Sequence, residues 1–575
     1  MIDRDGNIWR IRGGGLTLRL DAATGCPAAI ELDGCERPRF EHAAEVLVRD
    51  DRLRREFDSR DLDGVEIRRR GESLQVLRRF RGASWTLHES YRAEDDALRW
   101  EGEVALDRGA FRSCSVALRL PLPLPIYPLK VWAAGEGMPT QVARHAELAM
   151  EYGDINSGVV LPAVCLYVEK QAGLLLAMPF DFRAPLLRFK TSYREEYLEA
   201  RFDWMALRPG RPARTALLLR ATPGDWRPAL GWMHRRFPAH FRPRSRAVAR
   251  LWGGVMAERP RIVAPEEARL MARLGLRWFE VHEHFPGYGQ YHPEGEEQWI
   301  NKDYAFQNDP PVSPAVVRAC IRNLHAVKVA AMPYIQVTGD GDNERVAPVF
   351  PEAVMRDLRG RPFSSWVHTT MMNGDPSLPF GRDITRQIRG LLSRYPECDG
   401  VMAEGNKWAC EKFQYYCLEK PLYFYHWTKS DRDTEFMLQT ALLYGAGQCT
   451  NRPARRTWET LYARYLPLLA RLRRRRWIYD PDPFALPEGF DGAIYRGAKG
   501  TVLLSVVANL SRVPGRRLPP VTARVRTRRA ARATRATLQL PGGDIRPVAF
   551  GREKDAIQFD LPGGTAAALV EIEGI

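Results

Sequence analysis

The central part of the chain alternates between strand-like and helix-like segments, and this alternation constrains the fold more than any other feature. Apolar strand-like runs and amphipathic helical patterns follow one another at residues 251–256, 265–274, 278–282, 314–327, 329–337, 384–394 and 400–404. Strands that alternate with helices form parallel sheets wrapped by those helices. The stretch is roughly 230 residues long, which fits one (β/α)8-like TIM barrel, so we expect that barrel at residues 246–478.

Both flanks of this region have the pattern of antiparallel sheets. Residues 1–222 contain short alternating runs broken by Gly, Pro, Asp and Asn, which predict an N-terminal β-sandwich of many strands. Residues 223–245 predict a helical linker, and residues 479–575 predict a small C-terminal β-sandwich. With 575 residues the chain exceeds the size of one hydrophobic core. The predicted fold class is therefore multidomain, α/β plus all-β.

Charge and cysteine content exclude several classes of partner and cofactor. The chain has 86 Lys and Arg against 70 Asp and Glu, a net charge of +16. The excess Arg is spread along expected strand faces and helix ends without a nucleic-acid-binding motif, so we expect no nucleic-acid partner. The 9 cysteines form no Cys-x-x-Cys pair, which argues against a zinc site or a disulfide framework. We expect no cofactor.

The start of the chain and its apolar runs bear on localisation. Residues 1–5 lack the charged and apolar layout of a signal peptide, and no apolar run reaches the length of a membrane span. The sequence therefore predicts a cytoplasmic protein with no membrane partner. No feature of the sequence predicts an oligomeric state.

Two acidic residues lie where a barrel enzyme carries its chemistry. Glu404 ends the strand-like run Asp-Gly-Val-Met-Ala-Glu at residues 399–404, and Asp431 ends Trp-Thr-Lys-Ser-Asp at residues 427–431. Active sites of barrels lie at the carboxyl ends of the strands, and glycosidic cleavage uses two carboxyl groups. We therefore predict Glu404 and Asp431 as the catalytic pair, with Asp433 as the second choice for the later acid. The alternative readings are a loop-capping carboxylate for Glu404 and a helix N-cap for Asp431.

The order sandwich, barrel, sandwich resembles the retaining α-galactosidases and α-glucosidases of glycoside hydrolase families thirty-six and thirty-one. Gly-Leu-Thr-Leu-Arg-Leu-Asp at 15–21 followed by Thr24-Gly25 resembles their first hairpin, and Gly-Asp-Trp-Arg at 224–227 resembles the entry to their linker helix. Gly-Val-Met-Ala-Glu-Gly-Asn at 400–406 resembles their nucleophile strand, and residues 427–431 resemble the acid/base stretch of family thirty-six. The resemblance implies Glu404 as nucleophile and Asp431 as acid/base, in an enzyme that acts exo on an α-linked sugar.

Two departures from that family pattern affect the prediction. Glu404 stands where the family has aspartate, and the extra methylene moves the carboxylate outward by roughly one bond length; a shift of about 1 Å can cost ~100-fold in rate. The acid/base stretch carries one inserted residue. Only 27 residues lead from Glu404 to Asp431, short for two strand-helix units, so the intervening strand is expected to be shortened or absent.

Other residues near the expected strand ends are candidates for binding an oligosaccharide substrate. Glu280, His282 and His284 share one face of a strand because side chains alternate with period two. The substrate-binding candidates are Trp252, Glu280, His282, Tyr334, Trp366, His368, Asn373, Asp375, Asn406, Lys407, Trp408, His426 and Trp427. The alternative interpretation of each aromatic residue is that it packs in the hydrophobic core.

Two rival functions remain open from the sequence. A non-catalytic carbohydrate-binding protein on a degenerate glycosidase scaffold is favoured by Glu404 and the short span after it. A metal-dependent hydrolase would use the His-x-His pair His282 and His284, although no further ligand cluster has helpful spacing, so no metal site is predicted.

Overall fold

Two compact units make up the chain, and both are built from segments that are not contiguous in sequence. One unit comprises residues 1–242, 411–420 and 477–485, and the other comprises residues 243–410, 421–476 and 486–575. The computed structural model describes residues 1–575 except 34, 36–44, 125–127, 135–139, 142–146, 153–158, 183, 185, 193, 244–250, 257–262, 283, 293, 296, 302–310, 337–339, 357–359, 365–367, 400–401, 404–413, 416, 427–429, 451–457, 509–519, 544 and 564–565, together with the side chains of 140, 141, 402, 403, 425, 426 and 499.

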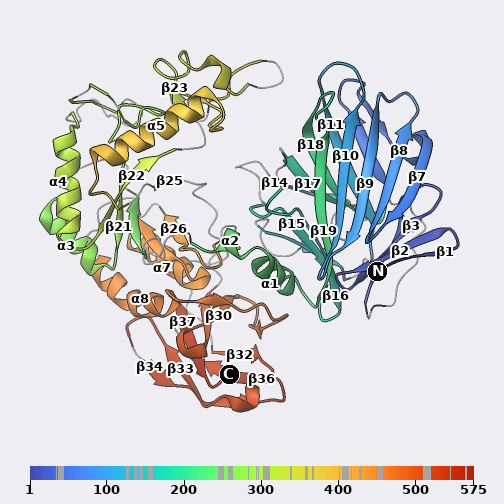
Figure 1. Cartoon of the computed structure of the whole chain (residues 1–575). Helices are drawn as coiled ribbons and strands as arrows, with labels where there is room; N and C mark the ends of the chain where they lie inside the picture. The colour runs from blue at the N-terminus through green and yellow to red at the C-terminus, as the bar shows by residue number, and fades with distance from the viewer. Residues whose placement is uncertain are drawn as a thin grey trace. The chain divides into compact units, whose positions relative to one another are not determined.

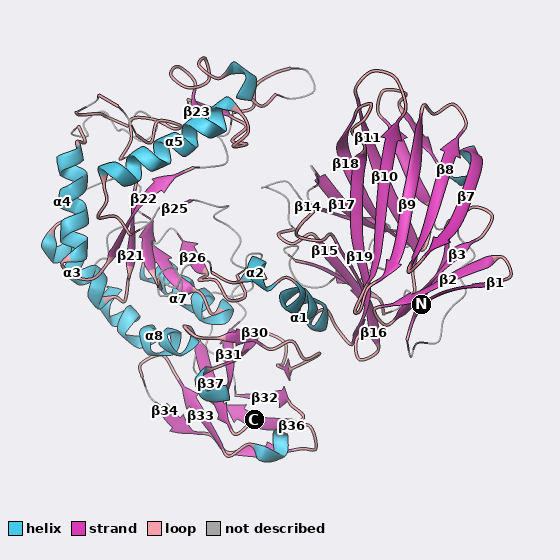
Figure 2. Cartoon of the chain, in the orientation of Figure 1, coloured by secondary structure: helices cyan, strands magenta, loops and turns pink. Residues whose placement is uncertain are grey.

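The first unit consists mainly of antiparallel strands (Figures 1 and 2). Its strands are β1 (Ile2–Asp5), β2 (Ile8–Gly13), β3 (Leu16–Asp21), β4 (Pro27–Leu32), β5 (Val46–Asp50), β6 (Arg55–Phe57), β7 (Leu62–Arg70), β8 (Ser73–Phe80), β9 (Trp85–Ala93), β10 (Leu98–Leu106), β11 (Arg112–Pro121), β12 (Lys130–Ala133), β13 (Thr140–Gln141), β14 (Glu147–Tyr152), β15 (Ala163–Tyr167), β16 (Ala172–Ala177), β17 (Leu186–Ser192), β18 (Tyr197–Leu207) and β19 (Ala213–Pro223). They form a four-stranded sheet, β1-β2-β3-β4, a nine-stranded sheet, β13-β12-β15-β16-β19-β10-β9-β8-β7, and a six-stranded sheet, β14-β17-β18-β11-β5-β6.

Period-two alternation in the sequence places one face of these strands in the core. Along β10 every second residue is buried, and the residues between them are partly exposed. A buried ion pair lies in this core, where the Arg78 guanidinium meets the Glu89 carboxylate and Tyr91 and Trp100 also donate to that carboxylate. Buried charges persist in proteins when they are paired and hydrogen-bonded, as these are.

Aromatic residues join the distant segments of the first unit. Helix α1 (Arg227–Arg236) and the short α2 (Pro238–Phe241) follow β19. Trp226 stacks on Trp132 with a centroid separation of 4.9 Å, and Tyr415 meets both rings edge-on. Trp477 contacts Trp226 and Tyr415. Residues from three separate stretches of sequence therefore form one apolar cluster.

The second unit contains a parallel sheet whose strands alternate with helices (Figure 2). The strands are β20 (Gly254–Met256), β21 (Trp278–Val281), β22 (Ala330–Ile335), β25 (Met402–Ala403), β26 (Tyr423–His426) and β27 (Gly447–Thr450), and the helices are α3 (Pro265–Arg273), α4 (Pro314–His325), α5 (Pro379–Arg394), α7 (Asp431–Tyr444) and α8 (Glu459–Leu472). Their order is β25-β22-β21-β20-β27-β26, and all the ladders between these strands are parallel.

Strand order in this sheet follows the sequence from β20 to β25, whereas β27 and β26 lie on the other side of β20. The first four strands are consecutive neighbours, whereas the last strand, β27, pairs with the first strand, β20. This is the order of a sheet that curls back toward its own beginning. Among the described residues, six parallel strands are present and no ladder joins β25 to β26. The packing is tight at β20, where a Cβ on Gly254 would lie 2.0 Å from the Trp278 ring.

The C-terminal residues of the second unit form further antiparallel sheets. One contains β30 (Phe490–Arg496), β31 (Val502–Ala508), β37 (Ala567–Glu573), β33 (Arg535–Gln539) and β34 (Ile545–Pro547) in that order, and another contains β32 (Val521–Arg526), β36 (Ala556–Leu561) and β35 (Phe550–Arg552). Short strands β28 (Arg476–Trp477) and β29 (Phe484–Ala485) precede them, and β23 (Asp340–Asp342) pairs with β24 (Thr369–Met371). None of the described helices is long and apolar enough to cross a bilayer.

Candidate active site

Three of the predicted binding residues meet where β21 and β22 end. In the parallel ladder Glu280 is level with Met332 and Val281 with Pro333, so the chain after β21 runs on beside Tyr334. The His282 and Tyr334 rings are stacked, with centroids 4.2 Å apart and planes 20° from parallel. Carboxyl ends of parallel strands are the edge at which α/β proteins place their ligands. Glu280, His282 and Tyr334 form a cluster there, which we call the strand-end cluster.

Hydrogen bonds fix the orientation of the strand-end cluster. Nδ1 of His282 lies 2.6 Å from Oε1 of Glu280, and the Tyr334 hydroxyl donates to Oε1 of Gln336 over 2.9 Å. The side chains are buried, with Glu280 1%, His282 5% and Tyr334 0% exposed. Polar groups held in place in a buried position need little rearrangement when a ligand binds, which is what a specific binding site requires.

His284 lies beside the cluster and bonds the main chain of the neighbouring strand, which is not the role of a metal ligand. Its Nε2 is 2.7 Å from the carbonyl oxygen of Tyr334, which can only accept, so Nε2 carries the proton. Burial lowers the pKa of His284 to about 4, so the imidazole is neutral at neutral pH. Among the residues that the structure describes, no three His, Cys, Asp or Glu side chains form a group able to hold a metal ion.

The loop after β21 adds aromatic and amide groups that the sequence analysis did not select. The Phe285 and Tyr291 rings are 4.9 Å apart, and the Tyr291 hydroxyl donates to the Gln336 carbonyl and accepts from the Gln336 amide. The Asn301 amide donates to the Phe285 carbonyl over 2.9 Å. These buried groups line the loop next to the strand-end cluster. Three aromatic residues within the loop run Phe-Pro-Gly-Tyr-Gly-Gln-Tyr at 285–291 were the available sequence signal.

Three other predicted binding residues are exposed and hold turns. His368 has a left-handed backbone, φ 58°, and its carbonyl accepts from the Asn343 amide. Asn373 accepts from the Asp375 amide, and Asp375 accepts from the Ser377 amide over 2.8 Å, in the turns before α5. Asn and Asp often close turns in this way. The structure thus places His368, Asn373 and Asp375 at the surface rather than in the buried strand-end cluster.

Trp252 lies at the other end of its strand. It lies two residues before β20, so it is at the amino end, whereas the strand-end cluster is at the carboxyl edge of the sheet. The ring is buried, and the Arg475 guanidinium lies 6.0 Å from its centroid. The structure does not bring Trp252 together with Glu280. In a parallel ladder the amino ends of the strands lie at one edge of the sheet and the carboxyl ends at the other.

The expected nucleophile follows a strand beside the cluster. In the ladder of β22 with β25, Tyr334 is level with Met402 and Ile335 with Ala403, and Glu404 is the next residue in the sequence. Glu404 itself lies outside the described residues, as do Trp366, Asn406, Lys407, Trp408 and Trp427. His426 is the last residue of β26, and its side chain is likewise outside the described set.

Asp431 is the first residue of helix α7. The helix cap is Ser430, whose hydroxyl accepts from the Asp433 amide, while the Asp433 carboxylate accepts from the Ser430 amide. This reciprocal arrangement is a capping box. It corrects the alternative reading of Asp431: the helix begins at Asp431, and Ser430 rather than Asp431 is the N-cap. Asp431 is also exposed rather than buried.

Comparison with known proteins gives a match at the level of structure only. No family model matches the sequence, and no curated protein sequence matches it. The GH36 α-galactosidase AgaB from Geobacillus stearothermophilus is 8% identical, with a TM-score of 0.59 and 100% of both chains covered. The galactosidase domain of the α-galactosidase-sucrose kinase AgaSK is 10% identical, with a TM-score of 0.57, 98% of this chain and 100% of that chain covered.

A third solved structure has a related but different activity. The α-N-acetylgalactosaminidase NagBb from Bifidobacterium bifidum, solved with GalNAc, is 12% identical with a TM-score of 0.57, over 88% of this chain and 99% of that chain. The similarity to all three therefore extends over nearly the whole length of the chain.

Proposed function

Since the chain has an α-galactosidase-like glycoside hydrolase fold, we propose that it is a retaining glycoside hydrolase that removes an α-linked sugar from the end of an oligosaccharide. The single observation that supports this most is the likeness to solved α-galactosidases over 97% or more of this chain. The turned-back order of the six described parallel strands supports a (β/α)8-like barrel in this proposal.

Glu404 and Asp431 take the two chemical roles in this proposal. Glu404 attacks the anomeric carbon and forms a glycosyl-enzyme bond, while Asp431 gives its proton to the leaving oxygen. Asp431 then removes a proton from water, and that water breaks the glycosyl-enzyme bond. Glu404 follows β25 in sequence and Asp431 follows β26, so each acid comes after a parallel strand, as a barrel active site requires.

The strand-end cluster is the sugar-binding part of the proposed site. The Glu280 carboxylate and the His282 imidazole suit the hydroxyl groups of a sugar, since hydrogen bonds to charged groups are stronger than neutral ones. The Tyr334 ring is stacked on His282 and holds that imidazole in place. Trp366, Asn406, Lys407, Trp408, His426 and Trp427 are further binding candidates in this proposal.

Enzyme assays with matched variants test the proposal. Release of p-nitrophenol from α- and β-glycosides is measured for the wild-type protein, Glu404→Gln, Asp431→Asn and the control Glu397→Gln. We expect turnover of an α-galactoside or a related α-glycoside, a loss of about 10³-fold or more in kcat for Glu404→Gln, and about 10²- to 10⁴-fold for Asp431→Asn. The anomer of the first product, followed by NMR, should match that of the substrate.

Several outcomes would contradict the proposal. If activity survives in Glu404→Gln, Glu404 is not the nucleophile. If the first product has the inverted anomeric configuration, the enzyme is not a retaining hydrolase. A greater loss in Asp433→Asn than in Asp431→Asn would move the acid/base role to Asp433. Binding of raffinose without turnover of any glycoside would favour the non-catalytic carbohydrate-binding alternative.

A further inference from the structure

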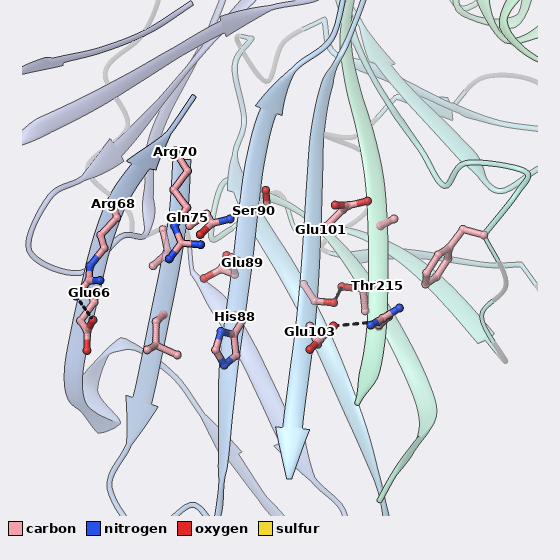
Figure 3. A pocket seen from close by; sticks show the side chains of 16 residues that line it. Glu66, Arg68, Arg70, Gln75, His88, Glu89, Ser90, Glu101, Glu103 and Thr215 are labelled. Carbon is pink, nitrogen blue, oxygen red and sulfur yellow. Dashed lines mark hydrogen bonds and ion pairs between the residues drawn. The ribbon is translucent and has the colours of Figure 1, made fainter. Parts of the chain in front are cut away.

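The outer face of the nine-stranded sheet has a polar hollow that is unrelated to the parallel sheet. A groove of about 680 Å³ crosses β7, β8, β9, β10 and β19 (Figure 3). That volume is within the range of small-ligand sites, about 300–1,000 Å³. All of its walls belong to the first compact unit.

Strand register explains why the hollow forms where it does. One row across the sheet consists of Arg214, Glu103, His88, Leu77 and Glu66, all of them long side chains. In the adjacent row, Ser90 lies between Gln75 and Glu101, and the short Ala216 is next to Glu101. Short side chains beside a row of long ones leave space above the sheet, with strands about 4.8 Å apart.

Most of the charged side chains in the groove are paired with a group of opposite charge, and Arg70 also belongs to the lining. Glu66 pairs with Arg68 at 3.0 Å, Glu103 with Arg214 at 2.9 Å, and Glu101 with Arg99 at 2.8 Å. A polyanion would meet these carboxylates, and an apolar partner would find few apolar side chains to cover. A neutral ligand with many hydroxyl groups suits the surface, because paired carboxylates and guanidinium groups still accept and donate further hydrogen bonds.

The centre of the groove has hydrogen-bonding groups that are not committed elsewhere. The side chains of Gln75 and Ser90 make no hydrogen bond to another described residue, and both point into the hollow in Figure 3. Phe182 supplies an aromatic ring to the lining. An amide, a hydroxyl and a ring are the groups with which proteins bind sugars, through hydrogen bonds and contact with the apolar face of the ring.

We propose that this groove binds a neutral oligosaccharide at a second site, apart from the strand-end cluster. The site holds sugar without cleaving it. The sugar binding proposed for the groove does not depend on the proposed hydrolysis, since the groove and the catalytic candidates belong to different compact units.

Calorimetric titration of the full chain tests the inference. Stachyose, maltotetraose and the acidic trigalacturonate are titrated into the wild-type protein, Ser90→Tyr, the double variant Gln75→Ala/Ser90→Ala and the control Arg92→Ala. Arg92 is exposed and lies two residues from Ser90 on the same strand, outside the groove. We expect a neutral tetrasaccharide to bind, and both groove variants to weaken that binding at least about tenfold, while Arg92→Ala does not.

The same titrations on Glu404→Gln separate this inference from the proposed hydrolysis. A groove site persists in Glu404→Gln and disappears when Ser90→Tyr is added, whether or not the wild-type protein turns over glycosides. The inference is overturned if neither neutral tetrasaccharide binds, if the groove variants bind as the wild type does, or if only trigalacturonate binds. Circular dichroism confirms that each variant is folded, and a crystal soaked with the bound sugar shows density over Ser90 or excludes it.

Discussion

Individual side chains determine how the strand-end cluster is held. The Glu280 carboxylate orients the His282 ring, and the Gln336 amide group holds the Tyr334 hydroxyl, so each polar side chain is fixed by a neighbour close in sequence. His284 instead reaches the main chain of the next strand and stays neutral because it is buried. The side chains of the strand-end cluster are therefore the ones that can face a ligand, whereas His284 joins two strands.

His284 makes the stability of the second unit depend on pH. Its pKa is about 4 in the folded protein and ~6.5 when unfolded, so its contribution is fully present above pH 6.5 and is lost as the pH falls toward 4. Between pH 7 and pH 4 the wild-type protein should lose about 3 kcal/mol more unfolding free energy than His284→Gln. Urea unfolding at four pH values measures this.

The surface histidine His368 provides the control for that experiment. His368→Gln, which replaces an exposed histidine, is unfolded in urea at the same four pH values for comparison. Parallel curves for wild type and His284→Gln between pH 7 and pH 4 would show that His284 does not titrate in a buried environment.

Helix α7 begins with a capping box beside Asp431, the proposed acid/base. Ser430 and Asp433 satisfy the first amide groups of the helix, and Asp431 lies between them, exposed and free of that capping role. The element thus presents Asp431 just after β26 from a fixed position. Replacement of Asp431 therefore leaves both capping hydrogen bonds in place.

Removal of the helix cap should lower the free energy of unfolding, while Asp431 itself is unchanged. Ser430→Ala should lower the free energy of unfolding by about 1 kcal/mol, because the Asp433 amide loses its acceptor. Arg432→Ala, in the same turn and exposed, and Asp431→Asn should both change it by less than about 0.5 kcal/mol. Chemical denaturation of the three variants gives the comparison, and a large loss in Asp431→Asn would indicate a structural rather than a catalytic role.

At the scale of the whole molecule, the chain returns twice to its first unit. Residues 411–420 and 477–485 belong with residues 1–242, and Tyr415 and Trp477 complete the aromatic cluster around Trp132 and Trp226. The cluster is built from side chains that are distant in sequence, so the first unit cannot bury it with residues 1–242 alone.

A fragment of residues 1–242 should therefore fold poorly. Loss of Tyr415 and Trp477 exposes Trp132 and Trp226, and the removal of a large buried aromatic residue such as Tyr415 typically costs about 3–5 kcal/mol. We expect the fragment to bind the dye ANS and to aggregate in size-exclusion chromatography, whereas the full chain does neither. A monomeric fragment with a cooperative thermal transition would contradict this.

Local patterns in the sequence were enough to predict the succession of elements in the central region and the proximity of Glu280 to His282. The predicted helices at residues 265–274, 314–327 and 384–394 correspond to α3, α4 and α5, although α5 begins five residues earlier, at Pro379, where no polar cap marks the start. Period two predicted that Glu280 and His282 share a face, and in the structure Nδ1 of His282, just after β21, lies 2.6 Å from Oε1 of Glu280. These properties depend on neighbours within one or two turns of backbone, so the sequence carries them directly.

The tertiary structure alone decided how distant segments meet. The pairing of β27 with β20, the discontinuous first unit, the loop residues Tyr291 and Asn301 beside the cluster, and the groove over Ser90 all join residues far apart in sequence. Which segments pair is set by the apolar area that they bury together against the entropy of closing the loops between them. No short pattern records that balance, so the sequence determined the elements and the packed chain determined their partners.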